Sequence, residues 1–204
     1  MITVWGRTNS PNVAKVLWTL DELELAYERI DAGGAFGLTG EPEYLAMNPN
    51  GRIPVCRDGE VVIWESNAIV RYLASRYGEG LLRHENAGRR SLDDRWMDWA
   101  SLTFYQPVLA LHRAAKMEAG AGRDEAITKA RVSLGEPVSV LSKVLKDKKH
   151  IAGDAFGIGD IALAPHVHRL MNAAGLFEPG EAIAAYHRRI VGRVAFSRHA
   201  ASIL

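Results

Sequence analysis

The sequence of 204 residues contains a single cysteine, Cys56. One cysteine cannot form an internal disulfide, and it excludes the paired Cys-x-x-Cys motifs of redox centres and zinc sites. Such a chain fits a reducing compartment, so we expect a cytoplasmic location. Because Cys56 falls inside a strand-like run, we expect its thiol to be buried and unreactive.

The sequence also lacks an excess of either charge, since 25 basic and 24 acidic residues leave a formal net charge of +1. No long-range field therefore exists to attract nucleic acid or an anionic membrane. No stretch approaches the roughly 20 apolar residues that span a bilayer, and no signal-like segment opens the chain. We expect a soluble protein that binds neither nucleic acid nor membrane.

Metal-binding patterns are absent as well. His166 and His168 lie two positions apart on a predicted helix, so their side chains point in different directions. We expect no metal, and we interpret both histidines as core or surface residues.

Residues 1–78 alternate between strand and helix patterns. The apolar run at 2–5 predicts a strand, and apolar residues then recur from Val13 to Leu20 at the spacing of an amphipathic helix. A strand at 27–31 completes a β-α-β unit, whose two strands should be parallel.

Two further strand-like runs flank Asp58-Gly59, a strong hairpin signal, and Ser66 is expected to cap a helix that ends before Gly78. The order β-α-β followed by β-β-α predicts an α/β domain with a mixed four-stranded sheet and helices packed on it.

Strand signals disappear from about Arg89 onward, and three long helical patterns replace them. Pro107 and Pro137 interrupt the first two, so each should kink or split its helix. Pro165 is expected near the first turns of the third helix, where a missing N–H is tolerated. We predict an α/β domain at 1–78, a linker at 79–88 and an all-helical bundle at 89–204.

Small polar side chains gather where the first strand meets the first helix, at Thr8, Asn9, Ser10 and Asn12. Pro11 suits the first helical position and Ser10 the cap before it, which by itself accounts for this serine. A capping hydroxyl nevertheless keeps its hydrogen to donate, at the helix end where an anion is stabilised. If that anion is a thiolate, its pKa falls by about one to two units from about 8.5.

Two more segments fit the binding of a peptide-like ligand. The sequence NPNGRIP at 48–54 places Pro54 at the start of a strand, where an unusual peptide geometry could turn the backbone of Ile53 outward. A simple turn is the structural alternative. Glu65 and Ser66 begin a helix and offer partners for the ammonium and carboxylate of an amino-acid head group; a helix cap is again the alternative.

These motifs, in this order and followed by a helical half, resemble the cytosolic glutathione S-transferase superfamily over nearly the whole chain. The pattern is similar to its bacterial, serine-type, theta-like and phi-like members. The resemblance implies a thioredoxin-like domain that binds glutathione as cosubstrate, a helical domain that lines the electrophile site, and a homodimer. It also implies an enzyme that conjugates glutathione to small hydrophobic electrophiles, a detoxification reaction, by stabilising the thiolate.

The same resemblance assigns roles to individual residues. Ser10 would donate to the glutathione thiolate, with Asn12 as the second candidate. Arg52 and the loop near Phe36 are candidates for contacts with the glycyl carboxylate.

Pro54 matches the family's cis-proline, so the backbone N–H and C=O of Ile53 would pair with the cysteinyl part of glutathione. Glu65 and Ser66 match the acidic and hydroxyl pair that binds the γ-glutamyl head group.

The sequence departs from the family pattern at two helix ends. Glu24 stands where many relatives have a glycine suited to a left-handed cap, at a cost near 1 kcal/mol. Gly157 stands where the family has Ser or Thr, three residues before Asp160, which we expect to be structural.

An electrophile pocket should be apolar and formed where the two domains meet. Phe104, Tyr105 and His112 fall on the first helix of the second half and are candidates to line it, with Leu109 at a matching spacing. Residues at such spacing also form helix cores, which is the structural alternative.

Two other functions are alternatives for such a chain. A transferase-like module without catalysis, kept for protein interaction or regulation, is compatible with the rest of the chain. Thiol-disulfide exchange would need a nucleophilic cysteine at the first helix, where this sequence has Ser10.

Overall fold

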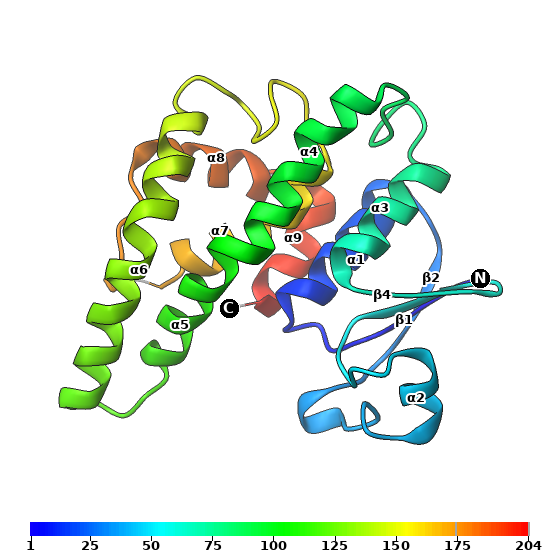
Figure 1. Cartoon of the computed structure of the whole chain (residues 1–204), viewed down its shortest axis with the longest axis horizontal. Helices are drawn as coiled ribbons and strands as arrows, with labels where there is room; N and C mark the ends of the chain where they lie inside the picture. Colours follow the sequence, from blue (N-terminus) through cyan, green and yellow to red (C-terminus); the bar gives the residue numbers. More distant parts are fainter. Residues whose placement is uncertain (174, 204) are drawn as a thin grey trace. The chain divides into compact units, whose positions relative to one another are not determined.

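The computed structural model describes residues 1–173 and 175–203, and Figure 1 labels their helices and strands. The described residues form two compact units, one made of 1–85 and 194–203 and the other of 86–193. Residues 194–203, which the predicted helical domain included, thus group with the first unit. Residue 204, the last of the predicted range, lies outside the described residues.

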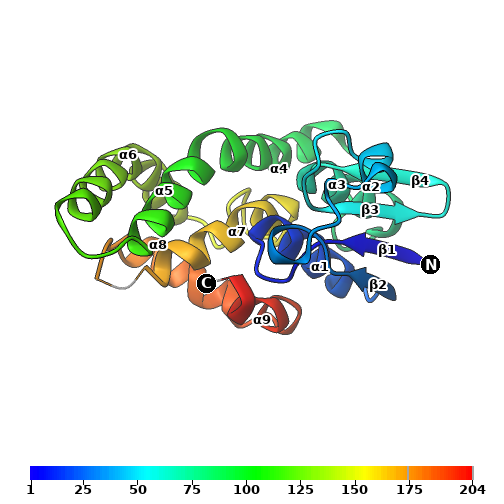
Figure 2. The same ribbon diagram turned by 90° about the horizontal axis from the view of Figure 1, so that it is seen from below.

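A mixed sheet of four strands forms the centre of the first unit, in the order β2-β1-β3-β4 (Figure 2). β1 pairs in parallel with β2 and antiparallel with β3, which pairs antiparallel with β4, as predicted. The hairpin turn consists of Gly59 and Glu60, because Asp58 still pairs with Val61. The strands are β1 (Ile2–Trp5), β2 (Tyr27–Ile30), β3 (Val55–Asp58) and β4 (Val61–Trp64).

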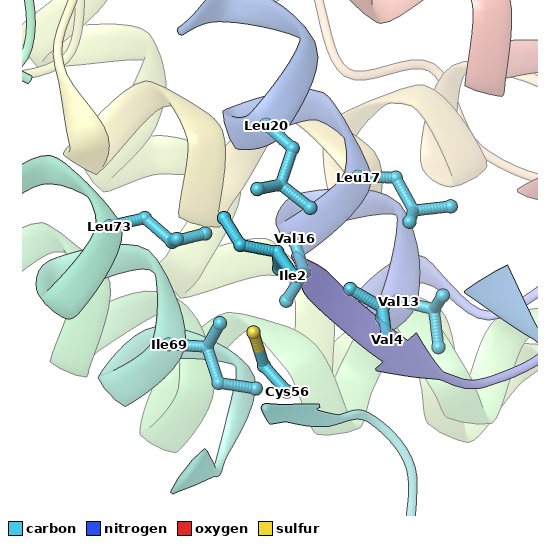
Figure 3. Packing of buried hydrophobic residues seen from close by; sticks show 9 residues of the cluster. All are labelled: Ile2, Val4, Val13, Val16, Leu17, Leu20, Cys56, Ile69 and Leu73. Carbon is cyan, nitrogen blue, oxygen red and sulfur yellow. The ribbon is translucent and has the colours of Figure 1, made fainter. Parts of the chain in front are cut away.

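Helices α1 (Pro11–Glu22) and α3 (Ser66–Tyr77) pack against each other and on one face of this sheet. Side chains alternate along a strand, so Ile2 and Val4 of β1 point to the same face. Figure 3 shows the core that results, with the Cys56 sulfur among its apolar side chains. This core comprises Ile2, Val4, Val13, Val16, Leu17, Leu20, Cys56, Ile69 and Leu73.

The opposite side of β1 carries Trp5, which packs against a smaller cluster of Ala32, Tyr44 and Val55. Tyr44 belongs to the short helix α2 (Pro42–Met47), which follows the 3-10 turn at Gly34–Phe36. The sheet thus carries α1 and α3 on one face and the smaller α2 cluster on the other, and the segment that leads into β3 is bonded to α2 through Tyr44 and Arg52.

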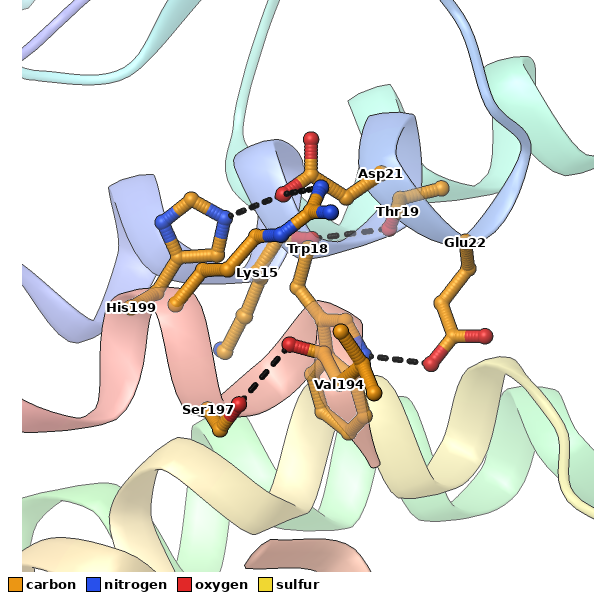
Figure 4. Close-up of polar contacts among 9 residues, drawn as sticks. Lys15, Trp18, Thr19, Asp21, Glu22, Val194, Ser197 and His199 are labelled. Carbon is orange, nitrogen blue, oxygen red and sulfur yellow. Dashed lines mark hydrogen bonds and ion pairs between the residues drawn. The ribbon is translucent and has the colours of Figure 1, made fainter. Parts of the chain in front are cut away.

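Helix α9 (Val194–Ala200) packs on α1 within the first unit, followed by a 3-10 turn at Ala201–Ile203. The Trp18 and Phe196 rings lie 4.7 Å apart, and both side chains are fully buried. The His199 ring nitrogen Nε2 lies 2.9 Å from a carboxylate oxygen of Asp21 (Figure 4). The sequence did not reveal this pairing, because its partners are separated by almost the whole chain.

Helix α1 ends in the geometry that a glycine normally provides. Glu24 has φ +53°, its N–H donates to the Asp21 carbonyl, and the Leu25 N–H donates to the Leu20 carbonyl at 2.9 Å. These two bonds define a Schellman motif with an exposed glutamate at the left-handed position. The predicted left-handed cap at Glu24 is confirmed.

The second unit is helical, as predicted. Helix α4 packs on α7, α5 packs on α6, and α8 contacts both α6 and α7. In the described part of the chain, no helix is long and apolar enough to cross a membrane. Its elements are α4 (Ala87–Trp99), a π-helical turn (Ala100–Phe104), α5 (Tyr105–Ala115), α6 (Ala121–Leu145), α7 (Ile158–Met171) and α8 (Glu181–Val191).

The prolines affect these helices differently from one another. The π-helical turn ends at Phe104, shortly before Pro107, and widens the backbone around Thr103, whose carbonyl the proline ring would otherwise meet. Helix α6 continues through Pro137 without a break. Pro165 lies inside α7, in its middle, so the prediction that it falls in the first turns was wrong. The helix begins at Ile158 after the cap at Gly157, as predicted.

Two buried carboxylates hold the start of α7. The Gly157 N–H donates to Asp160 at 3.1 Å, and the Gly159 N–H donates to Asp93 of α4 at 2.9 Å. A Cβ atom at Gly157 would lie only 2.5 Å from the same Asp93 oxygen. Asp93 therefore occupies the place of the missing Ser or Thr side chain, which explains the glycine.

Candidate functional site

The topology brings the predicted glutathione contacts to one edge of the sheet. β4 runs parallel to β1, because each is antiparallel to β3. Helices α1 and α3, which follow β1 and β4, therefore begin at the edge where β3 starts. Ser10, Ile53 and Glu65 mark these three positions, although they are far apart in the sequence.

Ser10 is the N-cap of α1, as predicted, and only 8% of it is exposed. Its Oγ accepts a hydrogen bond from the Val13 N–H at 3.5 Å, the long limit for such a contact. The hydroxyl hydrogen has no acceptor among the described residues. A buried donor thus remains at the positive end of the helix. Asn12, in the first turn, is half-buried.

The peptide bond between Ile53 and Pro54 is cis. Pro54 is buried, whereas Ile53 is half-buried at the same edge. Within residues 1–173 and 175–203, neither the N–H nor the C=O of Ile53 has a hydrogen-bond partner. This residue therefore presents one backbone donor and one backbone acceptor.

Helix α3 begins one residue earlier than predicted. Glu65 occupies the cap position with φ +69°, and Ser66 is the first helical residue, so the prediction that Ser66 is the cap was wrong. The exposed Glu65 makes no capping bond through its side chain, while Ser66 is buried. The left-handed backbone at Glu65 turns the chain sharply, which leaves the first N–H groups of α3 beside an acidic side chain.

Lys15 of α1 is a buried cation that the sequence analysis did not single out. Only 1% of it is exposed, and its ammonium group has no hydrogen-bond or ion-pair partner among the residues described. Burial lowers the pKa of Lys15 to about 7, although the negative charge of Glu65 acts in the opposite direction. A lysine inside the apolar α1 pattern was the only signal in the sequence.

The two candidates for the glycyl carboxylate are exposed. Arg52 projects from the segment before the cis peptide, and Phe36 is 54% exposed in its 3-10 turn. The Arg52 carbonyl, in contrast, is bonded to Tyr44 and Asn48, two buried residues that the sequence analysis also missed.

Two family models match the chain: "Glutathione S-transferase, N-terminal domain" over residues 1–75 and "Glutathione S-transferase, C-terminal domain" over residues 124–189. The chain is also 42% identical to glutathione S-transferase GstB of Escherichia coli K12, over 96% of this chain and 95% of GstB. The chain belongs to the glutathione S-transferase family. A glutathione S-transferase of Hyoscyamus muticus is 30% identical over 95% of this chain and 94% of its own length.

Solved structures of the glutathione S-transferase family share the fold. A theta class enzyme from Xanthomonas axonopodis pv. citri, solved with glutathione bound, is 37% identical with a TM-score of 0.87. That match covers 98% of this chain and 96% of the Xanthomonas chain. These comparisons confirm the predicted superfamily, the two-part fold and the prediction of a glutathione transferase enzyme.

The predicted electrophile residues of this glutathione S-transferase family member lie in the second unit. Phe104 is fully buried and stacks on Trp99 with ring centroids 5.7 Å apart, so it is a core residue and presents no surface to a ligand. Tyr105 and His112 are half-buried on α5. The Tyr105 ring lies 5.1 Å from the His166 ring. Burial, and next the positive charge of Arg169, lower the pKa of His112 to about 4.

Other reactive groups of the described residues have different surroundings. Cys56 is buried in the core, and its burial raises the pKa of the thiol to about 12. His168 does not share a ligand with His166, since its Nδ1 lies 2.9 Å from Nε2 of His187 on α8. In the described ranges, no three metal-ligating side chains are grouped around a common point.

Proposed function

We propose that this protein binds glutathione at the sheet edge where α1, β3 and α3 begin, and conjugates it to small hydrophobic electrophiles. The thiol loses its proton to solvent, and the thiolate sulfur forms a bond to an electrophilic carbon. The bonding electrons of that carbon move to a leaving group or to an adjacent acceptor atom. The observation that carries the proposal is the buried Ser10 hydroxyl, whose hydrogen has no other acceptor among the described residues.

The Ser10 hydroxyl and the α1 terminus act on the ionisation of the cosubstrate. A free thiol with a pKa of about 8.5 is only a few per cent ionised at neutral pH. The Ser10 hydroxyl donates a stronger hydrogen bond to the thiolate than to the neutral thiol, and the positive end of α1 also favours the anion. Together these two effects lower the pKa of the bound thiol by about one to two units. Such a shift makes a large fraction of bound glutathione nucleophilic without a protein base.

The rest of the edge supports recognition of a γ-glutamyl tripeptide. The backbone donor and acceptor of Ile53 match the antiparallel pairing of an extended cysteinyl residue. The N–H groups and hydroxyl at Ser66 suit the γ-glutamyl carboxylate, and Glu65 suits its ammonium. Arg52 is proposed to contact the glycyl carboxylate.

Replacing Ser10 with alanine tests the proposed role of the hydroxyl. We expect Ser10→Ala to raise the pKa of bound glutathione by about one unit, because one charge-assisted bond is lost. Glutathione affinity should change little, since the contacts of Ile53, Glu65 and Ser66 remain. The measurement is thiolate absorbance of bound glutathione as a function of pH.

Asn12→Ala is the matched control for this experiment, because it removes a neighbouring polar side chain of the same helix turn. We expect it to leave the thiol pKa unchanged. The opposite result, an unchanged pKa in Ser10→Ala and a raised pKa in Asn12→Ala, would transfer the role to Asn12.

We further propose a cytoplasmic homodimer whose reaction serves detoxification. Among the described strands, the edge strand β4 pairs only with β3, and Val61, Val62 and Trp64 are each about 40% exposed, which supports a contact surface. The single buried cysteine supports a reducing compartment. Tyr105 and His112 are proposed to contact the electrophile.

A further inference from the structure

The carbonyl oxygen of Arg52 is held by two buried side chains. The Tyr44 hydroxyl and the Asn48 side-chain amide each donate to it at 2.8 Å. Tyr44 is 3% exposed and Asn48 is 2% exposed. Because a carbonyl oxygen has two lone pairs, these donors use its full capacity.

The position of this oxygen determines the direction of the next N–H. The Arg52 carbonyl and the Ile53 N–H belong to one planar peptide unit, in which the two groups point in opposite directions when the bond is trans. The cis bond in this segment is the following one, between Ile53 and Pro54. Donors that fix the oxygen on one side therefore aim the unpartnered Ile53 N–H to the other side.

The donors themselves are anchored in the fold. Tyr44 belongs to α2 and packs in the small cluster beside β1 and β3. The Asn48 side-chain oxygen accepts bonds from the Asn50 backbone at 3.0 Å and from the Asn50 side chain at 3.1 Å. The Gly51 N–H closes the turn on the Asn48 carbonyl at 3.0 Å. The segment before Ile53 is thus tied at several points.

We propose that Tyr44 and Asn48 are positioning residues, which aim the Ile53 N–H at the cysteinyl carbonyl of glutathione. This inference rests on the proposed function. The cysteinyl residue also carries the sulfur, so a misdirected Ile53 peptide both weakens the backbone pairing and moves the sulfur away from Ser10. Loss of either donor should therefore change glutathione affinity and the pKa of the bound thiol together.

Tyr44→Phe removes one donor and keeps the buried ring. We expect glutathione to bind about three- to ten-fold more weakly, the range for loss of one neutral hydrogen bond. The pKa of the bound thiol should rise as well. Calorimetric titration with glutathione and thiolate absorbance against pH measure these two quantities.

Tyr72→Phe is the matched control, because the Tyr72 hydroxyl donates at 2.8 Å to Asp58 near the hairpin turn, away from the proposed site. Both variants lose one tyrosine hydrogen bond, so both should lower Tm to a similar degree. Only Tyr44→Phe should change affinity and thiol pKa. Equal glutathione affinity and equal thiol pKa in the two variants would overturn the inference.

Asn48→Asp provides a second variant of nearly the same shape, in which a carboxylate faces the Arg52 carbonyl in place of a donor. It should weaken glutathione binding at least as much as Tyr44→Phe. If neither variant folds, the backbone amide resonance of Ile53 in the unsubstituted protein decides the question. That resonance should shift when glutathione is added, and no shift would overturn the inference. Absence of glutathione binding by the unsubstituted protein would instead refute the proposed function, and the inference with it.

Discussion

Replacement of the buried Lys15 with methionine should stabilise the protein in a way that depends on pH. Methionine has a similar length and shape but carries no charge, so it fits the same buried position on α1. Burial of the Lys15 ammonium group removes its hydrating water, which destabilises the charged form. Among the described residues no hydrogen bond or ion pair compensates for this, and the negative charge of Glu65 does so only in part. The folded protein therefore holds this proton less tightly than the unfolded chain.

The magnitude follows from the two protonation equilibria. Burial lowers the pKa of Lys15 from its ordinary 10.5 to about 7. Between these values the unfolded chain binds more protons than the folded protein, so the unfolding free energy rises with pH by about 1.4 kcal/mol per pH unit. Below pH 7 the lysine is charged in both states and the full penalty, up to about 5 kcal/mol, is present.

Urea unfolding of the original protein and Lys15→Met, at pH 6.5 and at pH 9.5, measures this effect. We expect the stabilisation by methionine to be larger at pH 6.5 than at pH 9.5 by about 3 kcal/mol. Lys129→Met is the control, since the Lys129 side chain is 74% exposed and forms a surface ion pair with Glu125. It should change stability by less than about 1 kcal/mol at either pH. A stabilisation by Lys15→Met that is equal at both pH values would refute the reasoning.

Two further substitutions test helix ends, each by urea unfolding. Glu24→Gly should stabilise the protein by about 1 kcal/mol because glycine adopts the left-handed conformation without strain, whereas Glu24→Ala should bring no gain. Gly157→Ser should destabilise by about 1 to 3 kcal/mol, although serine is the better cap in general, because its Cβ would meet Asp93. Asp93→Ala should then lower the unfolding free energy less in the Gly157→Ser variant than in the original protein. Purely additive changes in unfolding free energy would contradict the steric explanation.

The first unit could be predicted in detail because its signals are local. Alternating and helical periodicities, Asp58-Gly59 and the Ser10-Pro11 cap each act within a few residues of chain. The order of these signals then leaves few ways to arrange four strands. The parallel pairing of β1 with β2 and the antiparallel hairpin both agree with the structure.

The differences from the sequence prediction concern features that residue type and spacing alone do not decide. Ser66 was predicted as a cap from its side chain, but the left-handed backbone of Glu65 moves the helix start by one residue. Pro165 was expected near the first turns of α7, but it lies in the middle of the helix, although the helix starts at Ile158 as expected. The spacing of Phe104 left a pocket role and a core role open, and Phe104 is fully buried and stacked on Trp99.

The sequence by itself determined the elements, their order, the capping hydroxyl at Ser10 and the family to which these motifs point, because each depends on neighbouring residues. The tertiary structure alone decided that three separate segments meet at one edge of the sheet. It also decided that Lys15 loses its water and that two buried donors direct the Ile53 peptide. The burial of Lys15 and the orientation of the Ile53 peptide depend on atoms from distant parts of the chain that only folding brings together. A local sequence pattern therefore cannot predict them.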